Sequence, residues 1–485
     1  MRVCSSLFVV VASAALAGVA CSDATSSPGS AGSGGSAGSA GAVGAAGSAG
    51  ASGGAVDDDP DPVITSSIRA ALGELRYDSA PPSLDPSNRV DGDAAARAFG
   101  HRLFFEPALS GRLLEGDNDG TSSTLGKAGE AGRVSCAGCH VPTAGFVDNR
   151  SPHRQISLGA LWGKRRAPTL LEVASTTLFN WDGRRDTIWG QAVGVMENKS
   201  EFNSGRLLVA QQVFRLHRTE YESVFGAMPQ LDDATRFPQL EPLQGGCDVG
   251  PEETAACRGK PGDKSDYDGM APAAQRDATT VTVNVAKAIA AYVRELRCGA
   301  SAFEQWLDGD EAALGRSAQR GAALFVGKAE CSGCHSGPNL SDGKFHNVGL
   351  RPATVAVAFT DSNDRGAGEA QALLLDDPLN TKGEFSDGDR GVLPMAVGPA
   401  LEGAFRTPTL RCIKDQPSYM HTAQLASLDE VVDFFDQGGD PAGFPGQSEI
   451  APLHLSARER ADLVAFIQAL QGDGPEADLL VSPAD

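Results

Sequence analysis

The stretch Cys136-Ala137-Gly138-Cys139-His140 occurs a second time as Cys331-Ser332-Gly333-Cys334-His335, and this repeat determines the expected fold. Two cysteines three residues apart on a nascent helix present both thiols to one edge of a porphyrin. The histidine that follows can then ligate the iron. The repeat therefore predicts two covalently bound c-type haems, with His140 and His335 as the proximal iron ligands.

Two other kinds of site also contain the C-x-x-C spacing. A redox-active cysteine pair does not need the histidine that follows. A zinc site would bring both halves together in one small module. Because the complete five-residue pattern occurs twice, haem attachment is the favoured interpretation.

Composition limits the partners that this chain is expected to bind. The 485 residues carry a formal net charge of −21, and 41% of them are hydrophobic, which is enough for a substantial core. The negative charge argues against nucleic acid as a partner and suits a small, basic electron-donor protein.

The N-terminal residues have the pattern of an export signal. Residues 1–20 combine Arg2 with a short apolar run and end in small residues before Cys21, as in a secretory signal peptide. The ending resembles a lipoprotein signal that would leave a lipid on Cys21. Gly18 stands where a larger aliphatic residue is usual, so cleavage without a lipid is the alternative. Residues 21–57 are rich in Gly, Ser and Ala and predict a flexible tether. We therefore expect a periplasmic or cell-envelope protein that touches the membrane only through Cys21.

Four cysteines remain outside the N-terminal segment and the two repeats: Cys247, Cys257, Cys298 and Cys412. An even number in an oxidising compartment predicts two disulfides. Cys247 and Cys257 close a short loop and form the expected first pair, which leaves Cys298 with Cys412. Free buried thiols are the alternative.

The spacing of apolar residues predicts a mainly α-helical fold of two c-type cytochrome-like haem domains with long loops. Helices are expected at residues 64–75, 94–105, 188–196, 206–214, 283–297, 310–325, 428–435 and 457–470. The N-terminal haem domain is expected at residues 58–300, with a Pro-, Gly- and Asp-rich insertion at 226–278. The C-terminal haem domain is expected at residues 301–475.

Further motifs surround the two repeats, in this order: Leu103–Ser110, Arg165–Leu170, Phe179–Arg184, Gly321–Phe325, Phe345–Leu350 and Phe405–Arg411. Together with the repeats they resemble the bacterial di-haem cytochrome c peroxidases and the related oxidases of the MauG type. The resemblance runs from about residue 90 to residue 472. It implies a peroxidase that reduces hydrogen peroxide with electrons from a small cytochrome c or cupredoxin.

The resemblance also implies roles for three residues. In the family, a tryptophan between the haems mediates electron transfer, and Gln and Glu residues ten and twenty positions later lie over the iron of haem one. These positions hold Trp181, Gln191 and Glu201. Glu201 is the implied general acid/base and Gln191 the implied positioning group. Polar residues on a solvated helix face, and a tryptophan with no role beyond the core, are the alternatives.

Three departures from the family pattern affect the expected chemistry. Classical members carry a distal histidine where this chain has residues 158–160, and the nearby His153 lies outside that position, so haem one is expected to have an open face. Arg166 replaces an asparagine that helps to hold calcium between the domains, so no calcium is expected. The sixth ligand of haem two, Met or Tyr in the family, is replaced by Phe435.

Met420 and His421 remain as candidate distal ligands of haem two. A MauG-like oxidase that modifies a protein or organic substrate is the second functional interpretation. A non-catalytic electron-transfer cytochrome is the third, although such a carrier would not need Gln191 and Glu201.

Overall fold

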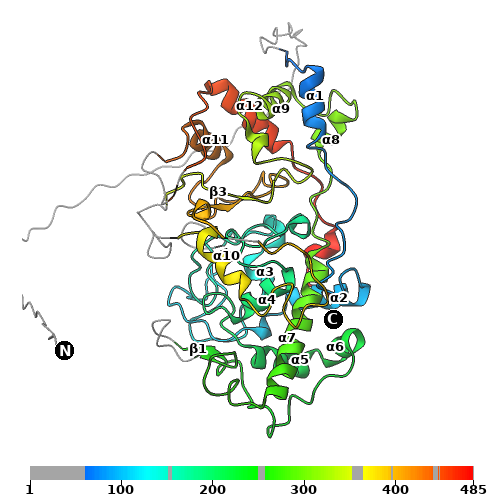
Figure 1. Ribbon diagram of the computed structural model, residues 1–485, viewed down its shortest axis with the longest axis vertical. Coiled ribbons are helices and arrows are strands. Elements are labelled where there is room, and N and C mark those ends of the chain that lie inside the picture. Colours follow the sequence, from blue (N-terminus) through cyan, green and yellow to red (C-terminus); the bar gives the residue numbers. More distant parts are fainter. Residues whose placement is uncertain are drawn as a thin grey trace, which may run out of the picture. The chain divides into compact units, whose positions relative to one another are not determined.

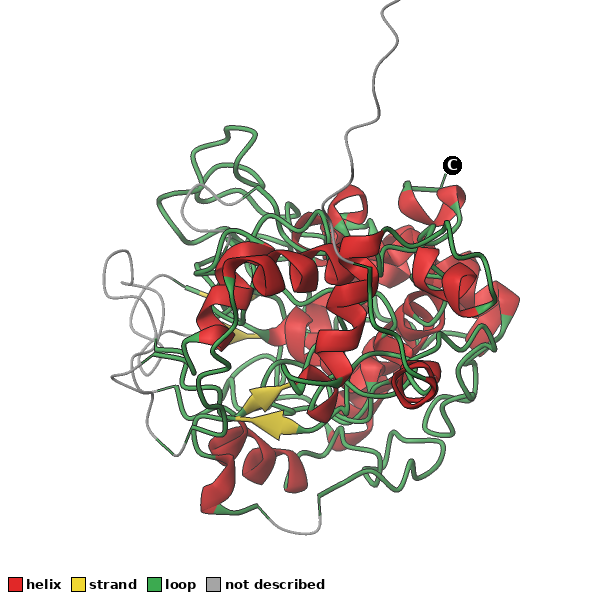
Figure 2. Cartoon of the chain, turned by 90° about the horizontal axis from the view of Figure 1, so that it is seen from above, coloured by secondary structure: helices red, strands yellow, loops and turns green. Residues whose placement is uncertain are grey.

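Helices supply most of the regular structure of this chain (Figures 1 and 2). The computed structural model describes residues 61–150, 156–248, 257–351, 364–394, 397–440, 446 and 448–483. The predicted signal peptide and tether lie outside these residues, and so does His153. The described elements belong to one compact unit, Asp59–Asp485. The prediction of a mainly helical fold is confirmed.

Twelve α-helices occur in the described residues: α1 (Ser66–Gly73), α2 (Ala94–Phe104), α3 (Cys136–Cys139), α4 (Ile188–Glu197), α5 (Arg206–Leu216), α6 (Arg218–Phe225), α7 (Pro272–Val293), α8 (Ala302–Leu307), α9 (Arg316–Val326), α10 (Ala367–Leu375), α11 (Leu428–Asp436) and α12 (Ala457–Gln468). Two short antiparallel strand pairs accompany them: β1 (Gly246–Cys247) with β2 (Cys257–Arg258), and β3 (Phe345–His346) with β4 (Phe405–Arg406).

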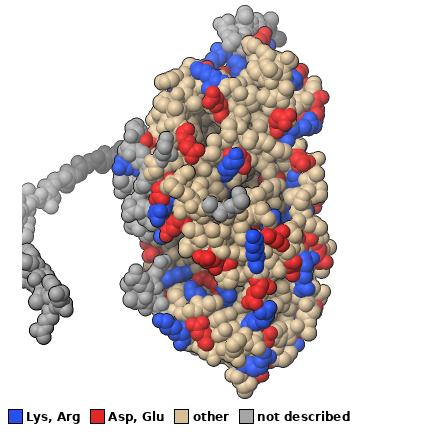
Figure 3. Space-filling model, viewed as in Figure 1, with Lys and Arg blue, Asp and Glu red and all other residues tan. Residues whose placement is uncertain are grey.

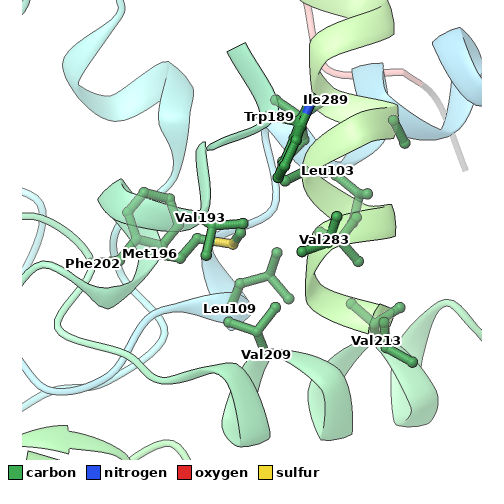
Figure 4. Packing of buried hydrophobic residues seen from close by; sticks show 14 of the residues in the cluster. Leu103, Leu109, Trp189, Val193, Met196, Phe202, Val209, Val213, Val283 and Ile289 are labelled. Carbon is green, nitrogen blue, oxygen red and sulfur yellow. The ribbon is translucent and has the colours of Figure 1, made fainter. Parts of the chain in front are cut away.

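The first hydrophobic cluster is built on α2, α4, α5 and α7. Figure 4 shows residues of this cluster, among them Val193 and Met196 of α4. Helix α2 crosses α7 at Gly100, where an added Cβ would lie 1.8 Å from the carbonyl oxygen of Ala288. Glycine is therefore required for this close approach of the two backbones.

Helix α7 begins earlier than the apolar pattern indicated. The predicted start was residue 283, whereas the helix starts at Pro272. Proline is well suited to a first helical turn because its missing N–H would have no partner there. Ala274 and Ala278 extend the buried side of the helix toward its start. Small alanine side chains among polar neighbours gave little periodic signal.

The second hydrophobic cluster joins α1, α8, α9, α11 and α12, which lie in the upper part of Figure 1. Helix α9 crosses α12 at Gly321, where an added Cβ would lie 1.9 Å from the carbonyl oxygen of Asp462. Helix α11 is capped by Ser427, whose side chain accepts a hydrogen bond from the backbone N–H of Glu430. Each cluster thus contains one close helix crossing that depends on glycine.

Both predicted disulfides are present. Cys247 is bonded to Cys257, and Cys298 is bonded to Cys412. The second bond joins the segment after α7 to the segment after β4, so it connects parts of the chain that lie before and after the second C-x-x-C-H repeat. The alternative of free thiols at these positions is wrong.

No helix in the described residues has both the length and the apolar composition needed to cross a membrane. On the face shown in Figure 3, acidic and basic side chains are interspersed. The net negative charge is therefore not gathered into one patch on that face.

Removal of the Cys298–Cys412 bond should destabilise the protein more than removal of the Cys247–Cys257 bond. The two bonds span 114 and 10 residues, and the chain-entropy model assigns them about 5 and about 3 kcal/mol. The double variants Cys298→Ala/Cys412→Ala and Cys247→Ala/Cys257→Ala should be compared by thermal unfolding of the intact protein. An equal or reversed order of the two midpoints would contradict the expectation.

Candidate functional site

The two C-x-x-C-H segments have the same local geometry. The backbone N–H of His140 donates to the carbonyl of Cys136 at 2.8 Å, and that of His335 donates to the carbonyl of Cys331 at 2.9 Å. Each segment therefore turns so that its histidine follows one helical turn after its first cysteine. The first segment is α3, and the second begins as a short 3₁₀ turn.

The two histidine rings are held in the tautomer that suits an iron ligand. His140 Nδ1 lies 3.0 Å from the carbonyl oxygen of Phe146, and His335 Nδ1 lies 2.9 Å from that of Leu340. Because a carbonyl can only accept, Nδ1 carries the proton and Nε2 keeps its lone pair. Burial lowers the pKa of both histidines, so both rings are held neutral.

A second pair of segments, Arg166–Leu170 and Arg406–Leu410, supports the two repeats in the same way. The hydroxyl of Thr169 donates to the carbonyl of Gly145 at 2.7 Å, and the hydroxyl of Thr409 donates to that of Asn339 at 2.7 Å. Each threonine thus ties its segment to the loop that follows one C-x-x-C-H repeat. The structure contains two equivalent half-sites.

A cavity of about 500 Å³ lies at the first half-site. Its walls include Cys136, Cys139 and His140, together with Gln191 and Glu201. Apolar side chains complete much of the lining: Leu103, Phe104, Leu109, Ile188, Val195, Met196 and Phe202. The structure thus brings together the predicted attachment residues and the predicted distal pair.

The cysteines of the repeats are free of disulfides. Burial raises the pKa of Cys136, Cys139 and Cys331 to about 12. A redox-active pair requires an accessible thiolate, which these surroundings disfavour. The environment therefore suits thiols that receive a porphyrin better than thiols that cycle through a disulfide.

Two buried guanidinium groups line the same cavity. Arg166 and Arg406 are 3% and 8% exposed, and burial lowers the pKa of each to about 10. Arg166 Nε has no hydrogen-bond partner among the described residues. Buried cations require an anionic partner, and the propionate groups of a haem are anions of the right chemistry. With the thiols, the neutral histidine and the apolar walls, these residues fit a haem.

Trp181 connects the two half-sites. Its indole Nε1–H donates to the backbone carbonyl of Arg166 at 2.8 Å, and its own carbonyl accepts from the backbone N–H of Arg406 at 2.7 Å. Trp181 lines both the large cavity and a second cavity of about 160 Å³. It is therefore bonded to both supporting segments at once.

Gln191 and Glu201 reach the large cavity from α4 and from the turn after it. Thr187 caps α4 by accepting from the N–H of Gly190, which fixes the helix start ahead of Gln191. Glu201 is anchored through its carbonyl, which accepts from the N–H of Ala160 at 2.9 Å. Burial raises the pKa of the Glu201 carboxyl, and the nearby Arg184 and Arg185 oppose that rise.

Asn180 is a site residue that the sequence interpretation missed. Its side-chain Nδ2 donates to Gln191 Oε1 at 2.6 Å, which leaves the Nε2–H groups of Gln191 free to donate elsewhere. Asn180 has φ of +68°, in the left-handed region that asparagine tolerates. The Asn180 carbonyl accepts from Arg406 Nε at 3.1 Å. In the sequence, Asn180 is marked only by its place directly before Trp181 in the motif Phe179–Arg184.

Residues 158–160 stand where the family resemblance predicts a distal histidine. They pack against the turn that contains Ser200 and Glu201. Gly159 lines the large cavity without a side chain. A Cβ at this position would lie 2.7 Å from the carbonyl oxygen of Ser200. The segment therefore contributes backbone, not an imidazole, to the wall beside Glu201.

The candidate distal ligands of haem two have different surroundings. The His421 ring stacks on Phe405 with centroids 3.7 Å apart, and burial lowers its pKa to about 3. Met420 lines the smaller cavity. Met420 and Cys331 both pack against the second hydrophobic cluster. Phe435 lies in α11 beside Phe434.

Arg166, the residue that the sequence predicts in place of calcium, is buried beside Gln416. Arg166 Nη2 donates to the side-chain oxygen of Gln416. The described residues contain no cluster of three or more His, Cys, Asp or Glu side chains that could hold a metal ion.

The family model of the di-haem cytochrome c peroxidases matches residues 94–312. The chain is 31% identical to the methylamine utilization protein MauG of Methylorubrum extorquens over 377 residues, or 78% of each protein. It is 30% identical to the cytochrome-c peroxidase IdrP1 of Denitromonas iodatirespirans over 424 residues, or 85% of this chain and 91% of that protein.

A solved structure has a similar fold. The diheme peroxidase BthA of Burkholderia thailandensis superposes with a TM-score of 0.54 at 18% identity, over 85% of this chain and 96% of that one. The family model ends before Cys331, whereas the match to BthA extends over most of both chains.

Proposed function

The chain belongs to the di-haem cytochrome c peroxidase family, and we propose that it reduces hydrogen peroxide to water with electrons from a small redox protein. One observation carries this proposal. Glu201 and Gln191 line the same cavity as Cys136, Cys139 and His140, so a proton-transfer group and an amide donor share one enclosed space with the haem attachment residues.

The first haem would be held covalently by Cys136 and Cys139, with His140 Nε2 on its iron. Cys331, Cys334 and His335 would hold the second haem in the same way. When bound, the irons supply the single-electron chemistry that peroxide reduction requires. Arg166 and Arg406 would pair with propionate groups, which would give each buried cation its anion.

Glu201 would move the proton during peroxide cleavage. Its carboxylate would take the proton from one peroxide oxygen and return it to the other, so that the departing oxygen leaves as water. Gln191 would donate from Nε2–H to the peroxide, because its Oε1 is held by Asn180. Asn180 thereby acts as a positioning residue for Gln191.

Trp181 would pass electrons from the second half-site to the first. The indole is readily oxidised, is largely buried, and is hydrogen-bonded to the supporting segment of each half-site. An electron-transfer cytochrome without turnover would leave Glu201 and Gln191 without a role. A MauG-like oxidase would use the same residues on a different substrate, and nothing in the described cavities favours that substrate over peroxide.

The proposal also covers the domain division, the distal ligand of haem two and the location of the protein. Each proposed haem domain, residues 58–300 and residues 301–475, would contain one half-site, and α1 of the first domain packs in the second hydrophobic cluster. Met420 is the better candidate for the distal ligand of haem two, because the ring of His421 is stacked on Phe405. Export to the periplasm, with a lipid at Cys21 as the membrane attachment, would place the site near small cytochromes or cupredoxins.

Steady-state consumption of hydrogen peroxide with a reduced small cytochrome as donor tests the function. Glu201→Gln should lower kcat/KM by about 10²–10⁴-fold, the usual contribution of a general acid/base. In the wild type, kcat/KM should fall as the pH drops through the raised pKa of Glu201, because the carboxylate is the form that accepts a proton. The variant should lack this acidic limb.

Glu369→Gln, at an exposed position of α10, is the matched control and should behave as the wild type. A wild type that consumes no peroxide with any reduced cytochrome or cupredoxin would overturn the proposed function. Full activity in Glu201→Gln would remove Glu201 from the mechanism.

Trp181→Phe should slow donor-supported turnover by more than about tenfold, equivalent to about 1.4 kcal/mol in the barrier. Phenylalanine keeps much of the packing but loses the oxidisable indole and its hydrogen bond to Arg166. Trp162→Phe is the control, since the Trp162 indole bonds to Asp117 and lines neither cavity. Stopped-flow spectra should show slower electron arrival at haem one, and unchanged arrival would contradict the relay.

We also propose that the site functions without calcium, because the Arg166 guanidinium supplies a fixed positive charge where relatives bind the ion. Purified protein should contain no stoichiometric calcium by elemental analysis. Chelation should leave donor-supported turnover unchanged. Loss of activity on chelation that is restored by added calcium would contradict this expectation.

A further inference from the structure

Tyr77 differs from the other tyrosines of the chain in the partner of its hydroxyl. The Tyr77 hydroxyl donates to Glu172 Oε1 at 2.8 Å. The other hydroxyls contact backbone carbonyls, an amide or a threonine, at Tyr292, Tyr419, Tyr221 and Tyr267. A carboxylate can accept a proton near neutral pH, whereas those partners cannot. Among the tyrosines, Tyr77 is therefore the one prepared to lose its proton when oxidised.

The Tyr77–Glu172 pair lies next to the proposed electron path. Glu172 lines the cavity of about 160 Å³ that Trp181 also lines. Tyr77 is 8% exposed, and its hydroxyl reaches this cavity wall through the hydrogen bond to Glu172. The backbone N–H of Tyr77 donates to the Glu304 side chain at 3.1 Å. Tyr77 is therefore bonded to one residue that precedes Cys298 in the sequence, Glu172, and to one that follows it, Glu304.

Two arginine side chains place positive charge next to the Tyr77 ring. The guanidinium groups of Arg297 and Arg411 lie 5.0 and 4.9 Å from the centre of the Tyr77 ring. Positive charge nearby disfavours a ring that becomes positive itself, so the electron can leave only if the phenolic proton leaves as well. Burial and the bond to Glu172 raise the pKa of Tyr77 to about 12, so the phenol is protonated at rest.

The acceptor is equally well fixed. Glu172 is 3% exposed, and its Oε1 also accepts from the backbone N–H of Cys298 at 2.8 Å. Its other oxygen lies 3.5 Å from Arg297 Nε and has no hydrogen-bond partner among the described residues. The carboxyl therefore retains an acceptor position while it holds the tyrosine.

We infer that Tyr77 and Glu172 form a protein redox site that supplies one electron to the peroxide-oxidised centre when no external donor is present. The inference rests on the proposed peroxidase function. In the step, the O–H bond of Tyr77 breaks, its proton moves to Glu172, and its electron travels by way of Trp181. A neutral phenoxyl radical and a protonated carboxyl remain.

The electron and proton balance closes with hydrogen peroxide as the oxidant. One molecule of peroxide takes up two electrons and two protons and leaves as two waters. Tyr77 would supply one electron, and the bound haem cofactors would supply the other. The two protons for water arrive through Glu201 and from solvent, because the tyrosine proton stays on Glu172.

Electron paramagnetic resonance of the intact di-haem protein, frozen after hydrogen peroxide is added without a donor, tests the inference. The wild type should give a tyrosyl signal that narrows when the protein contains ring-deuterated tyrosine. Tyr77→Phe should lose this signal while keeping the ring between its two arginines. Glu172→Gln should lose it as well, because the proton acceptor is gone.

Tyr419→Phe is the matched control, since Tyr419 is buried, lines the cavity that Glu172 and Trp181 also line, and its hydroxyl donates to backbone carbonyls. It should keep the signal. Donor-supported turnover of Tyr77→Phe should equal that of the wild type, because the donor then supplies both electrons.

A signal that persists in Tyr77→Phe, or that disappears in Tyr419→Phe instead, would overturn the inference. A wild type that consumes peroxide but forms no tyrosyl radical would overturn the inference alone. A wild type that consumes no peroxide would overturn the proposed function and this inference together.

Discussion

The arrangement of the site depends on two hydrogen bonds of Trp181, one donated by its indole N–H and one accepted by its backbone carbonyl. One reaches the carbonyl of Arg166 and the other comes from the N–H of Arg406, so a single residue fixes the distance between two segments that lie 240 positions apart in the sequence (406 − 166). Each of these segments is tied by a threonine to the loop after one C-x-x-C-H repeat. A shift of Trp181 would therefore move one half-site relative to the other.

The two half-sites share their histidine geometry and their supporting threonines, and they differ in other side chains around the cavities. Both histidines donate from Nδ1 to a backbone carbonyl, so both present Nε2 as a ligand. At the first half-site, a buried carboxyl and an oriented amide, Glu201 and Gln191, line the cavity that contains the attachment residues. In the proposed function, these two distal side chains would direct the peroxide chemistry to that half-site. Function here resides in the site and not in the fold.

The sequence predicted those features that depend on local spacing or on counting. The repeats, the helices with a clear apolar stripe and both disulfides belong to this class. Asn180, Tyr77 and Glu172 could not be predicted, because their importance comes from contacts. The Tyr77–Glu172 bond joins residues 95 positions apart, and no periodicity marks either partner. The early start of α7 was missed for a related reason, since alanines buried among polar residues carry little hydrophobic signal. The distal ligand of haem two depends on how the segment around Met420 meets the cofactor, which spacing alone does not encode.

Charge links the fold to its cofactor. Arg166 and Arg406 are buried, and burial shifts the pKa of each downward, so the protein alone bears the cost of two poorly compensated cations. An anionic group in the cavity removes this cost, which means that binding of a haem and completion of the fold favour one another. In the proposed function, Arg166 also replaces the calcium ion that the family resemblance implies between the half-sites. One arginine would then serve two purposes, as an anchor for an anion and as the fixed charge between the half-sites, and both purposes follow from its position next to Trp181.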